Sequence, residues 1–357
     1  MADKSFNYSI NGLRGLCIFM VFIFHVENSG LLHGDGGVFR GFLSTFKYGV
    51  EIFFMISGYV IVSSIRRKND LKEFYKDRML RIYPVWIPMH LATFVLAPLV
   101  GKSPVHADQP LYIWVIYFFS AMFLLPPVVP VPLFHPAAWS LSYEWFFYIA
   151  AGLVAVLATI MRKNIWLSCV GYALAAILVA VFLNIFPRAV FFIPGVIVTL
   201  YEDKIRKWAS FFSFPAIFLV AFLVAWSFTG ADPAEPATTM REWAGDARIL
   251  AALLALIFGF IAFAGIALGR GTLAGLLSKP IMQFYGKISY SFYLASTLAF
   301  FPVKVFTTSF LLGNVSYPLA LSFFVVLSFL LSTLMAWASW YVIEYRFSYY
   351  LKKKIHG

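Results

Sequence analysis

Hydrophobic residues form long runs along most of this chain, and short polar segments separate the runs. Several runs reach the ~20 residues that an α-helix needs to cross a lipid bilayer. We predict ten crossings, over residues 11–32, 46–65, 83–101, 139–161, 165–186, 188–203, 212–229, 249–268, 281–304 and 317–345. The expected fold class is therefore all-α: a polytopic membrane protein with about ten transmembrane helices in a single domain over residues 1–350.

One apolar segment, from Leu111 to Leu125, does not fit a simple crossing because it runs directly into four prolines between residues 126 and 132. Proline lacks the backbone N–H and breaks helices. Irregular backbone at membrane depth is tolerated only against protein or water. We therefore predict a re-entrant or interfacial element over residues 111–135. The alternative is an eleventh crossing. It would put the basic pair at residues 162–163 on the outer side, against the tendency of basic loops to lie in the cytoplasm.

The basic residues gather in a few short segments, at residues 66–81, 162–163, 204–207 and 352–354. Such clusters mark the cytoplasmic loops of membrane proteins. They predict a cytoplasmic N-terminus, a basic cytoplasmic tail at residues 351–357, and an acidic loop at residues 230–246 on the outer side. The formal net charge of +12 is explained by this placement. It therefore gives no reason to expect a nucleic-acid partner.

Composition agrees with this picture, because 61% of the residues are hydrophobic and 12% are charged, against about 25% charged in soluble domains. The first apolar run has full helix length and no small-residue cleavage site, so we expect an anchor and no cleavable signal. Cys17 and Cys169 stand alone in apolar runs. They are interpreted as small core residues, and no metal site is predicted.

Two ionisable residues, Arg14 and His25, lie within or at the ends of the first apolar run, eleven residues apart. At ~100° and ~1.5 Å per residue they share one helical stripe, roughly 16 Å apart along the axis. Ionisable side chains at membrane depth are costly and usually face a protein interior or a watery cavity. This stripe indicates a reaction path or a transport path.

The first basic loop carries a second candidate site. Residues 71–81 are typical of an amphipathic helix that lies in the membrane interface, with the next helix starting near Pro84. Phe74, Arg78 and Arg81 follow at spacings of four and three, so they share a face. Two arginines on one face form a forked site for phosphate. The alternative is lipid headgroup binding and control of topology.

Two further segments carry polar side chains inside apolar helices. In the second span, Ser57 and Gly58 favour close helix packing, and Glu51 requires a partner such as a cation or an imidazole. In the fourth span, Ser140, Glu144 and Tyr148 recur every four residues and form a polar stripe. Trp139 and Tyr148 alone would be interfacial belt residues. Glu144 is the member that indicates function.

Taken in chain order, these segments resemble the acyltransferase family 3 membrane proteins, which are acyl-CoA-dependent acyltransferases of bacterial surface sugars. The matching elements are Arg14 with His25, Phe53 to Ile61 with Ser57-Gly58, Phe74 to Pro84 with Arg78 and Arg81, and Trp139-Ser140-Leu141-Ser142-Tyr143-Glu144. Weaker likeness continues at residues 285–294 and Glu344. Asn11 departs from the Asp often found there, and Tyr345 from a common Pro.

The resemblance implies a membrane O-acyltransferase that moves an acyl group, usually acetyl, from cytoplasmic acyl-CoA to a sugar hydroxyl. His25 would act as base or acyl carrier. Arg14 would orient the thioester or hold a phosphate, and Arg78 and Arg81 would hold the phosphates of coenzyme A. Glu51 would orient or charge-balance His25.

On the acceptor side, the resemblance implies Glu144 with Trp139, Ser140, Ser142 and Tyr148, open to the outer face. The expected partners are acyl-CoA as co-substrate, a surface or lipid-linked sugar, and membrane lipids, with no metal. The expected location is the bacterial inner membrane. The main alternative is a transporter or flippase of a lipid-linked sugar or lipid, which explains the buried charges equally well.

Overall fold

The structure is a computed structural model, and it describes residues 6–32, 37–68, 70–99, 103–106, 108–126, 131–161, 165–230, 248–347 and 350. Its regular elements are helices, joined by short 3₁₀ and π-helical segments. The helices are α1 (Tyr8–Glu27), α2 (Gly37–Ser44), α3 (Gly49–Lys68), α4 (Leu71–Leu99), α5 (Leu111–Met122), α6 (Ala138–Met161), α7 (Ile165–Ile185), α8 (Phe192–Arg206), α9 (Pro215–Ser227), α11 (Arg248–Ala267), α12 (Gly271–Leu277), α13 (Pro280–Phe306) and α14 (Tyr317–Ser339).

Seven helical segments among the described residues are long and apolar enough to cross a membrane, so the predicted all-α polytopic fold is confirmed. They are Tyr8–Glu27, Gly37–Lys68, Leu71–Leu99, Ala138–Ala158, Arg248–Ala267, Pro280–Leu311 and Tyr317–Phe347. The other three predicted spans coincide with α7, α8 and α9, which are helical too. The count of ten crossings stays a prediction.

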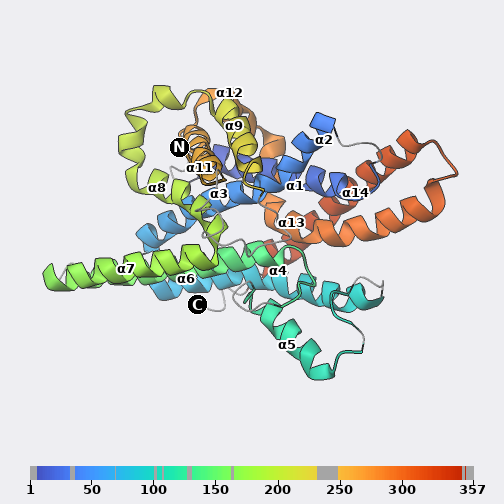
Figure 1. Ribbon diagram of the computed structural model, residues 1–357, viewed down its shortest axis with the longest axis horizontal. Coiled ribbons are helices and arrows are strands. Elements are labelled where there is room, and N and C mark those ends of the chain that lie inside the picture. The colour runs from blue at the N-terminus through green and yellow to red at the C-terminus, as the bar shows by residue number, and fades with distance from the viewer. Residues whose placement is uncertain are drawn as a thin grey trace.

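Helices α1 and α3 lie in the middle of the bundle (Figure 1). On one side, α3 packs on α8, and α9 pairs with α11. On the other side α6 and α7 form a long pair beside α4, while α13 packs on α1 and pairs with α14. The functional side chains described below come from α1, α3, α4, α6 and α13, which meet at the centre of this arrangement.

The close packing of α3 on α8 follows from two glycines. A Cβ on Gly58 would collide with the carbonyl oxygen of Phe192, and a Cβ on Gly195 would collide with that of Met55. Small residues let membrane helices approach backbone to backbone. The packing role predicted for Gly58 is therefore confirmed. Its neighbour Ser57 points instead into the pocket described below.

The segment 111–135 contains α5, whose twelve residues span about 18 Å, well short of the ~30 Å of a bilayer core. The helix ends at Met122, and Leu124, two residues later, is a non-glycine residue in the left-handed region with φ of 56°. The amide of Leu125 then bonds the carbonyl of Ser120 at 3.0 Å, which closes the last turn. This geometry fits the predicted re-entrant element better than an eleventh crossing.

Ring N–H groups from α4 satisfy the last carbonyls of α5. Trp86 Nε1 donates to the carbonyl of Met122 at 3.1 Å, and His90 Nε2 lies 3.1 Å from that of Phe118. The two rings are four residues apart on α4, so they meet successive turns of α5. The carbonyl of Met122 at the helix end needs such a partner, and α4 thus supports the turn at the end of α5.

The predicted interfacial helix at residues 71–81 is wrong, because α4 runs without interruption from Leu71 to Leu99 through Pro84 and Pro88. Phe74, Arg78, Ile82 and Val85 are all buried along one face. This inward stripe continues across Pro84, so packing on the neighbouring helices outweighs the helix-breaking tendency of proline. The shared face predicted for Phe74, Arg78 and Arg81 is correct.

Cys17 is buried in the core as expected, whereas Cys169 is exposed on α7, so the core assignment of Cys169 is wrong. Most of α7 beyond its contact with α6 presents apolar side chains outward, as a lipid-facing helix does. Three predictions lie outside the described residues: the basic tail at residues 351–357, the basic pair at 162–163, and most of the acidic loop at 230–246.

Candidate functional site

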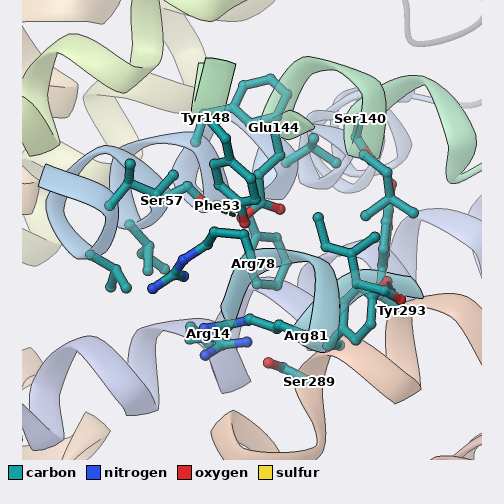
Figure 2. A pocket seen from close by; sticks show the side chains of 18 residues that line it. Arg14, Phe53, Ser57, Arg78, Arg81, Ser140, Glu144, Tyr148, Ser289 and Tyr293 are labelled. Carbon is teal, nitrogen blue, oxygen red and sulfur yellow. Dashed lines mark hydrogen bonds between the residues drawn. The ribbon is translucent and has the colours of Figure 1, made fainter. Parts of the chain in front are cut away.

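A pocket with about 750 Å³ of empty space lies between α1, α3, α4, α6 and α13 (Figure 2). We call it the central pocket. Its polar lining consists of Arg14, Ser57, Arg78, Arg81, Ser140, Glu144, Tyr148, Ser289, Tyr290 and Tyr293. All four elements singled out in the sequence thus supply side chains to one cavity from helices distant in the chain. The Arg14–His25 element supplies Arg14 alone.

The arginines of this pocket come from two helices. Arg14 projects from α1, and Arg78 and Arg81 project from α4, one turn apart. Arg78 is buried, lies over the rings of Phe74 and Tyr148 at 5.5 and 5.7 Å, and donates to the hydroxyl of Ser64 at 3.1 Å. Such stacking fixes the plane of a guanidinium while leaving its other N–H groups available.

Arg14 and Arg81 are half-buried, and within the described residues neither makes a hydrogen bond or an ion pair. Glu144 is the one carboxylate in the lining of the central pocket. Three guanidinium groups therefore outnumber one carboxylate in a cavity at membrane depth. A charge in such a place is stable only with a compensating partner. The arrangement is suited to an anionic ligand.

The carboxylate of Glu144 is held by two hydroxyl groups. Ser57 on α3 donates to its Oε1 at 3.0 Å, and Tyr148, one turn later on α6, donates to the same oxygen. The polar stripe predicted from the four-residue spacing on α6 therefore faces the cavity. Because Oε1 is occupied, Oε2 is the oxygen left to meet an arginine or a ligand.

At the other end of the pocket, the hydroxyls of Ser140 and Tyr293 lie 2.8 Å apart and bond each other. The sequence marked residues 285–294 only as a weaker likeness and gave no site role to Tyr293, or to Ser289 and Tyr290 on the same helix. The four-residue spacing of Ser289 and Tyr293 was the signal that would have indicated a polar face on α13.

His25 is half-buried and is not part of the central pocket's lining. Its ring packs near those of Phe24 and Phe300, with centroids 5.6 and 5.9 Å away. Phe22, one turn before His25, contacts Phe292, the neighbour of Tyr293. His25 therefore lies about one helical turn beyond the Ser140–Tyr293 end of the pocket, on the side away from the arginines.

Glu51 is fully buried, and its cationic partner is Arg188 from the segment before α8. Arg188 Nε donates to Glu51 Oε1 at 2.7 Å, and Trp226 Nε1 donates to the same oxygen at 3.0 Å. The expected cationic partner is therefore found, whereas no contact in the described residues links Glu51 to His25. The guanidinium also lies over the ring of Trp139, at 4.6 Å.

Two predicted acceptor-side residues lie behind the pocket wall. Trp139 is buried in the core beneath Arg188, and Ser142 is fully buried and donates to the carbonyl of Ala138 within its own helix at 2.9 Å. Of that predicted set, the structure places Ser140, Glu144 and Tyr148 in the pocket. One face of α6 thus lines the cavity and the opposite face packs in the core.

Two further hollows open from Arg14 toward the end of the bundle where α1 begins. We call this the basic end, since it carries Arg66, Arg67, Lys68, Lys204 and Lys207. The first hollow, the α4 mouth, has about 930 Å³ of empty space and is lined by Arg78, Arg81, Lys287, Asp77 and Glu344, among others. The second, the α1–α8 cleft, has about 1490 Å³ and lies between α1, α3 and α8.

Comparison with known proteins gives a consistent result. The family model described as "Acyltransferase domain" matches residues 7–337, nearly the whole chain. The acyltransferase MdmB of Streptomyces mycarofaciens is 29% identical over 195 residues, which cover 52% of this chain and 49% of that protein. A protein of Acidianus two-tailed virus, provisionally named an acetyltransferase, is 25% identical over 240 residues, 62% of this chain and 67% of that protein.

Longer relatives occur in Staphylococcus aureus. One, provisionally named an O-acetyltransferase, is 28% identical over 169 residues, 43% of this chain and 26% of that protein. The matched region thus spans about half of the Streptomyces protein and about a quarter of the staphylococcal one. No solved structure matches the chain.

Proposed function

Since this chain belongs to the acyltransferase family whose domain it carries over residues 7–337, we propose that it is a membrane O-acyltransferase that uses acyl-CoA. The acyl group is acetyl, as the names of the viral and staphylococcal relatives suggest. The acceptor is a hydroxyl of a surface or lipid-linked sugar. The bacterial inner membrane is its location, with both termini in the cytoplasm.

The observation that carries this proposal is the cluster of Arg14, Arg78 and Arg81 around one cavity with a single carboxylate in its lining. Coenzyme A brings phosphate groups, which guanidinium groups bind through paired, charge-assisted hydrogen bonds. In the proposed complex, these arginines hold the diphosphate of the donor. A lipid headgroup would satisfy surface arginines equally well, but these three point into the bundle.

The spacing of Arg14 and His25 on α1 suits the shape of this donor. With the diphosphate at Arg14, the pantetheine arm extends along α1, and the thioester comes to lie toward His25, roughly 16 Å away. The Ser140–Tyr293 pair lies on the way and offers hydroxyl groups to the arm or to the acceptor. His25 is half-buried, so its ring is not sealed off by the protein around it.

In the proposed reaction, the acceptor hydroxyl oxygen attacks the thioester carbonyl carbon, and His25 takes the hydroxyl proton as general base. The carbon–sulfur bond then breaks. The coenzyme A sulfur leaves with the proton that His25 returns, so the products are an ester and free coenzyme A. An acyl group carried on His25 is the two-step form of the same reaction.

Glu144 and Glu51 have different parts in this proposal. Glu144 balances one of the three arginine charges and, through its second oxygen, is able to accept a hydrogen bond from a ligand. Glu51 acts through Arg188 as a structural group, because its contacts are with Arg188 and Trp226. The guanidinium of Arg188 also lies over the ring of Trp139, and Trp139 supports the wall of the central pocket that contains Ser140.

The test is acyl transfer by the purified protein in detergent micelles, with acetyl-CoA and a panel of glycan acceptors. Release of free coenzyme A that requires acceptor, together with a mass increase of one acetyl group on the glycan, is the expected result. Movement of a lipid-linked sugar across vesicles without acetyl-CoA turnover would instead identify a flippase. Mass spectrometry of surface glycans with and without the gene identifies the natural acceptor.

A further inference from the structure

We propose that the α1–α8 cleft is the subsite for the 3′-phosphoadenosine end of the donor, with Arg67 binding the 3′-phosphate. This inference rests on the proposed function, and it names a second binding site that the arginines of the central pocket do not supply. The cleft is lined by Phe6, Asn7, Tyr59, Ser63, Arg67 and Glu202, among others. Rings, amides and a cation together suit a nucleotide.

The cleft adjoins the central pocket, since Arg14 and Val60 line both. Helix α3 forms a common wall: Ser57 faces Glu144 in the central pocket, and Arg67 lies ten residues later in the cleft. Ten residues of helix rise about 15 Å. In the proposed complex, a donor with its diphosphate near Arg14 extends its nucleoside toward Arg67 and its thioester toward His25.

The chemistry of the two hollows at the basic end distinguishes them. The α4 mouth contains the carboxylates of Asp77 and Glu344 beside four cations, and its lining among the described residues includes no aromatic ring. The α1–α8 cleft presents Phe6 and Tyr59 and is larger. An adenine ring is stabilised by stacking on aromatic side chains, and of these two hollows the α1–α8 cleft is the one whose described lining offers such rings. The nucleoside is therefore assigned to the α1–α8 cleft.

Besides Arg14, which the cleft shares with the central pocket, two arginines line the cleft, and they have different surroundings. Arg66 is committed to the fold, because its guanidinium donates to the carbonyl of Thr199 on α8 at 2.8 Å. Arg67 is exposed and makes no hydrogen bond or ion pair within the described residues. The one carboxylate of the cleft, Glu202, is already paired with Arg206. Arg67 is thus the cation whose charge is available to a phosphate.

The test compares coenzyme A with 3′-dephospho-coenzyme A, by equilibrium binding to the purified full-length protein in micelles. The wild type is expected to bind coenzyme A more tightly. Arg67→Ala should weaken binding of coenzyme A about tenfold, the loss of one charge-assisted bond, and should leave binding of the dephospho compound within twofold. Arg270→Ala is the matched control, since Arg270 is exposed and lines neither hollow.

A second pair of variants tests the choice of hollow. Phe6→Ala should weaken both compounds alike by about fivefold, because both carry the adenine ring. Lys287→Ala, in the α4 mouth, should leave the preference for the 3′-phosphate unchanged. If Lys287→Ala abolishes that preference and Arg67→Ala does not, the nucleotide lies in the α4 mouth and the inference is wrong.

Two other outcomes also overturn the subsite. One is equal wild-type affinity for the two compounds. The other is an Arg67→Ala variant that loses co-purified anionic lipid while keeping its affinity for coenzyme A, which would assign Arg67 to a lipid phosphate. Failure of the proposed function has a separate signature. Binding that depends on Arg67 and the 3′-phosphate, without transfer to any acceptor, would retain the subsite and refute the transferase.

Discussion

Two groups of buried charges share the same bundle, and they differ in how completely they are compensated. The Glu51–Arg188 pair has one anion and one cation, with Trp226 and Trp139 enclosing it. The central pocket has three guanidinium groups and the carboxylate of Glu144 around open space. A closed pair indicates a structural role, whereas a cluster in which cations outnumber carboxylates beside a cavity indicates a ligand. Substitutions in the Glu51–Arg188 pair should therefore lower stability, whereas substitutions in the central pocket should weaken ligand binding.

The largest effect is expected from Glu51→Ala, which leaves Arg188 buried without its anion. Breaking a buried pair in this way costs about 3–5 kcal/mol. We expect loss of folded protein, measured as a lower thermal unfolding temperature and loss of a single peak in size-exclusion chromatography. Replacing both partners, as Glu51→Leu with Arg188→Met, should recover much of the stability, because no charge is then left unpaired.

Glu27→Ala is the control for this variant. Glu27 pairs with Arg40 at a partly exposed position, with side chains 12% and 35% accessible. Exposed pairs contribute about 0–1 kcal/mol. If the Glu51→Ala protein is as stable as the Glu27→Ala protein, the enclosed Glu51–Arg188 pair contributes no more to stability than the Glu27–Arg40 pair. The structural role assigned to the enclosed pair would then be wrong.

His25→Ala should leave the fold intact and remove acyl transfer. Loss of a general base lowers the rate by about 10²–10⁴-fold, which is assayed as acetyl-CoA turnover in micelles alongside thermal unfolding. His106→Ala, at an exposed loop position, is the matched control and should keep full activity. Near-normal turnover by the His25→Ala protein would make His25 a packing residue and would contradict the mechanism.

Arg78→Ala and Arg81→Ala should each weaken acyl-CoA binding by roughly tenfold or more, since a charge-assisted bond to phosphate contributes about 1.5–3 kcal/mol. Arg81 has no bond to lose within the described protein, so its removal should leave the unfolding temperature unchanged. Arg206→Ala, which removes an exposed pair, should change neither property. Equal donor affinity in the wild type and the Arg78→Ala/Arg81→Ala double variant would leave these arginines as lipid anchors.

The substitutions with the smallest expected effect test which side of the membrane each end of the α5 region faces. Single cysteines replace Gln109 or Pro136, both exposed on either side of the α5 region, in a background without Cys17 and Cys169. Both should react with an impermeant thiol reagent on intact cells, whereas a cysteine at Lys207, at the basic end, should not. If only one of the first two reacts, the segment 111–135 crosses the membrane, and the donor and acceptor entrances must be reassigned.

The sequence by itself determined the fold class and most members of the site. Long apolar runs cannot be stable in water, so their lengths predict membrane helices. Polar side chains inside such runs are costly and therefore conspicuous. That is why Arg14, Glu144 and Tyr148 were found by spacing alone, and why the inward face of Arg78 and Arg81 was correct even though α4 was divided at Pro84.

Only the tertiary structure decided which charges compensate one another. Glu51 and Arg188 are 137 positions apart, and no local spacing reveals that they meet. Tyr293 became part of the pocket through its contact with Ser140 on another helix, and Trp139 and Ser142 were turned into the core. Periodicity fixes the face of a helix on which a residue lies. Which neighbour that face meets depends on how the helices pack, because helix packing is set by side chains far apart in the chain.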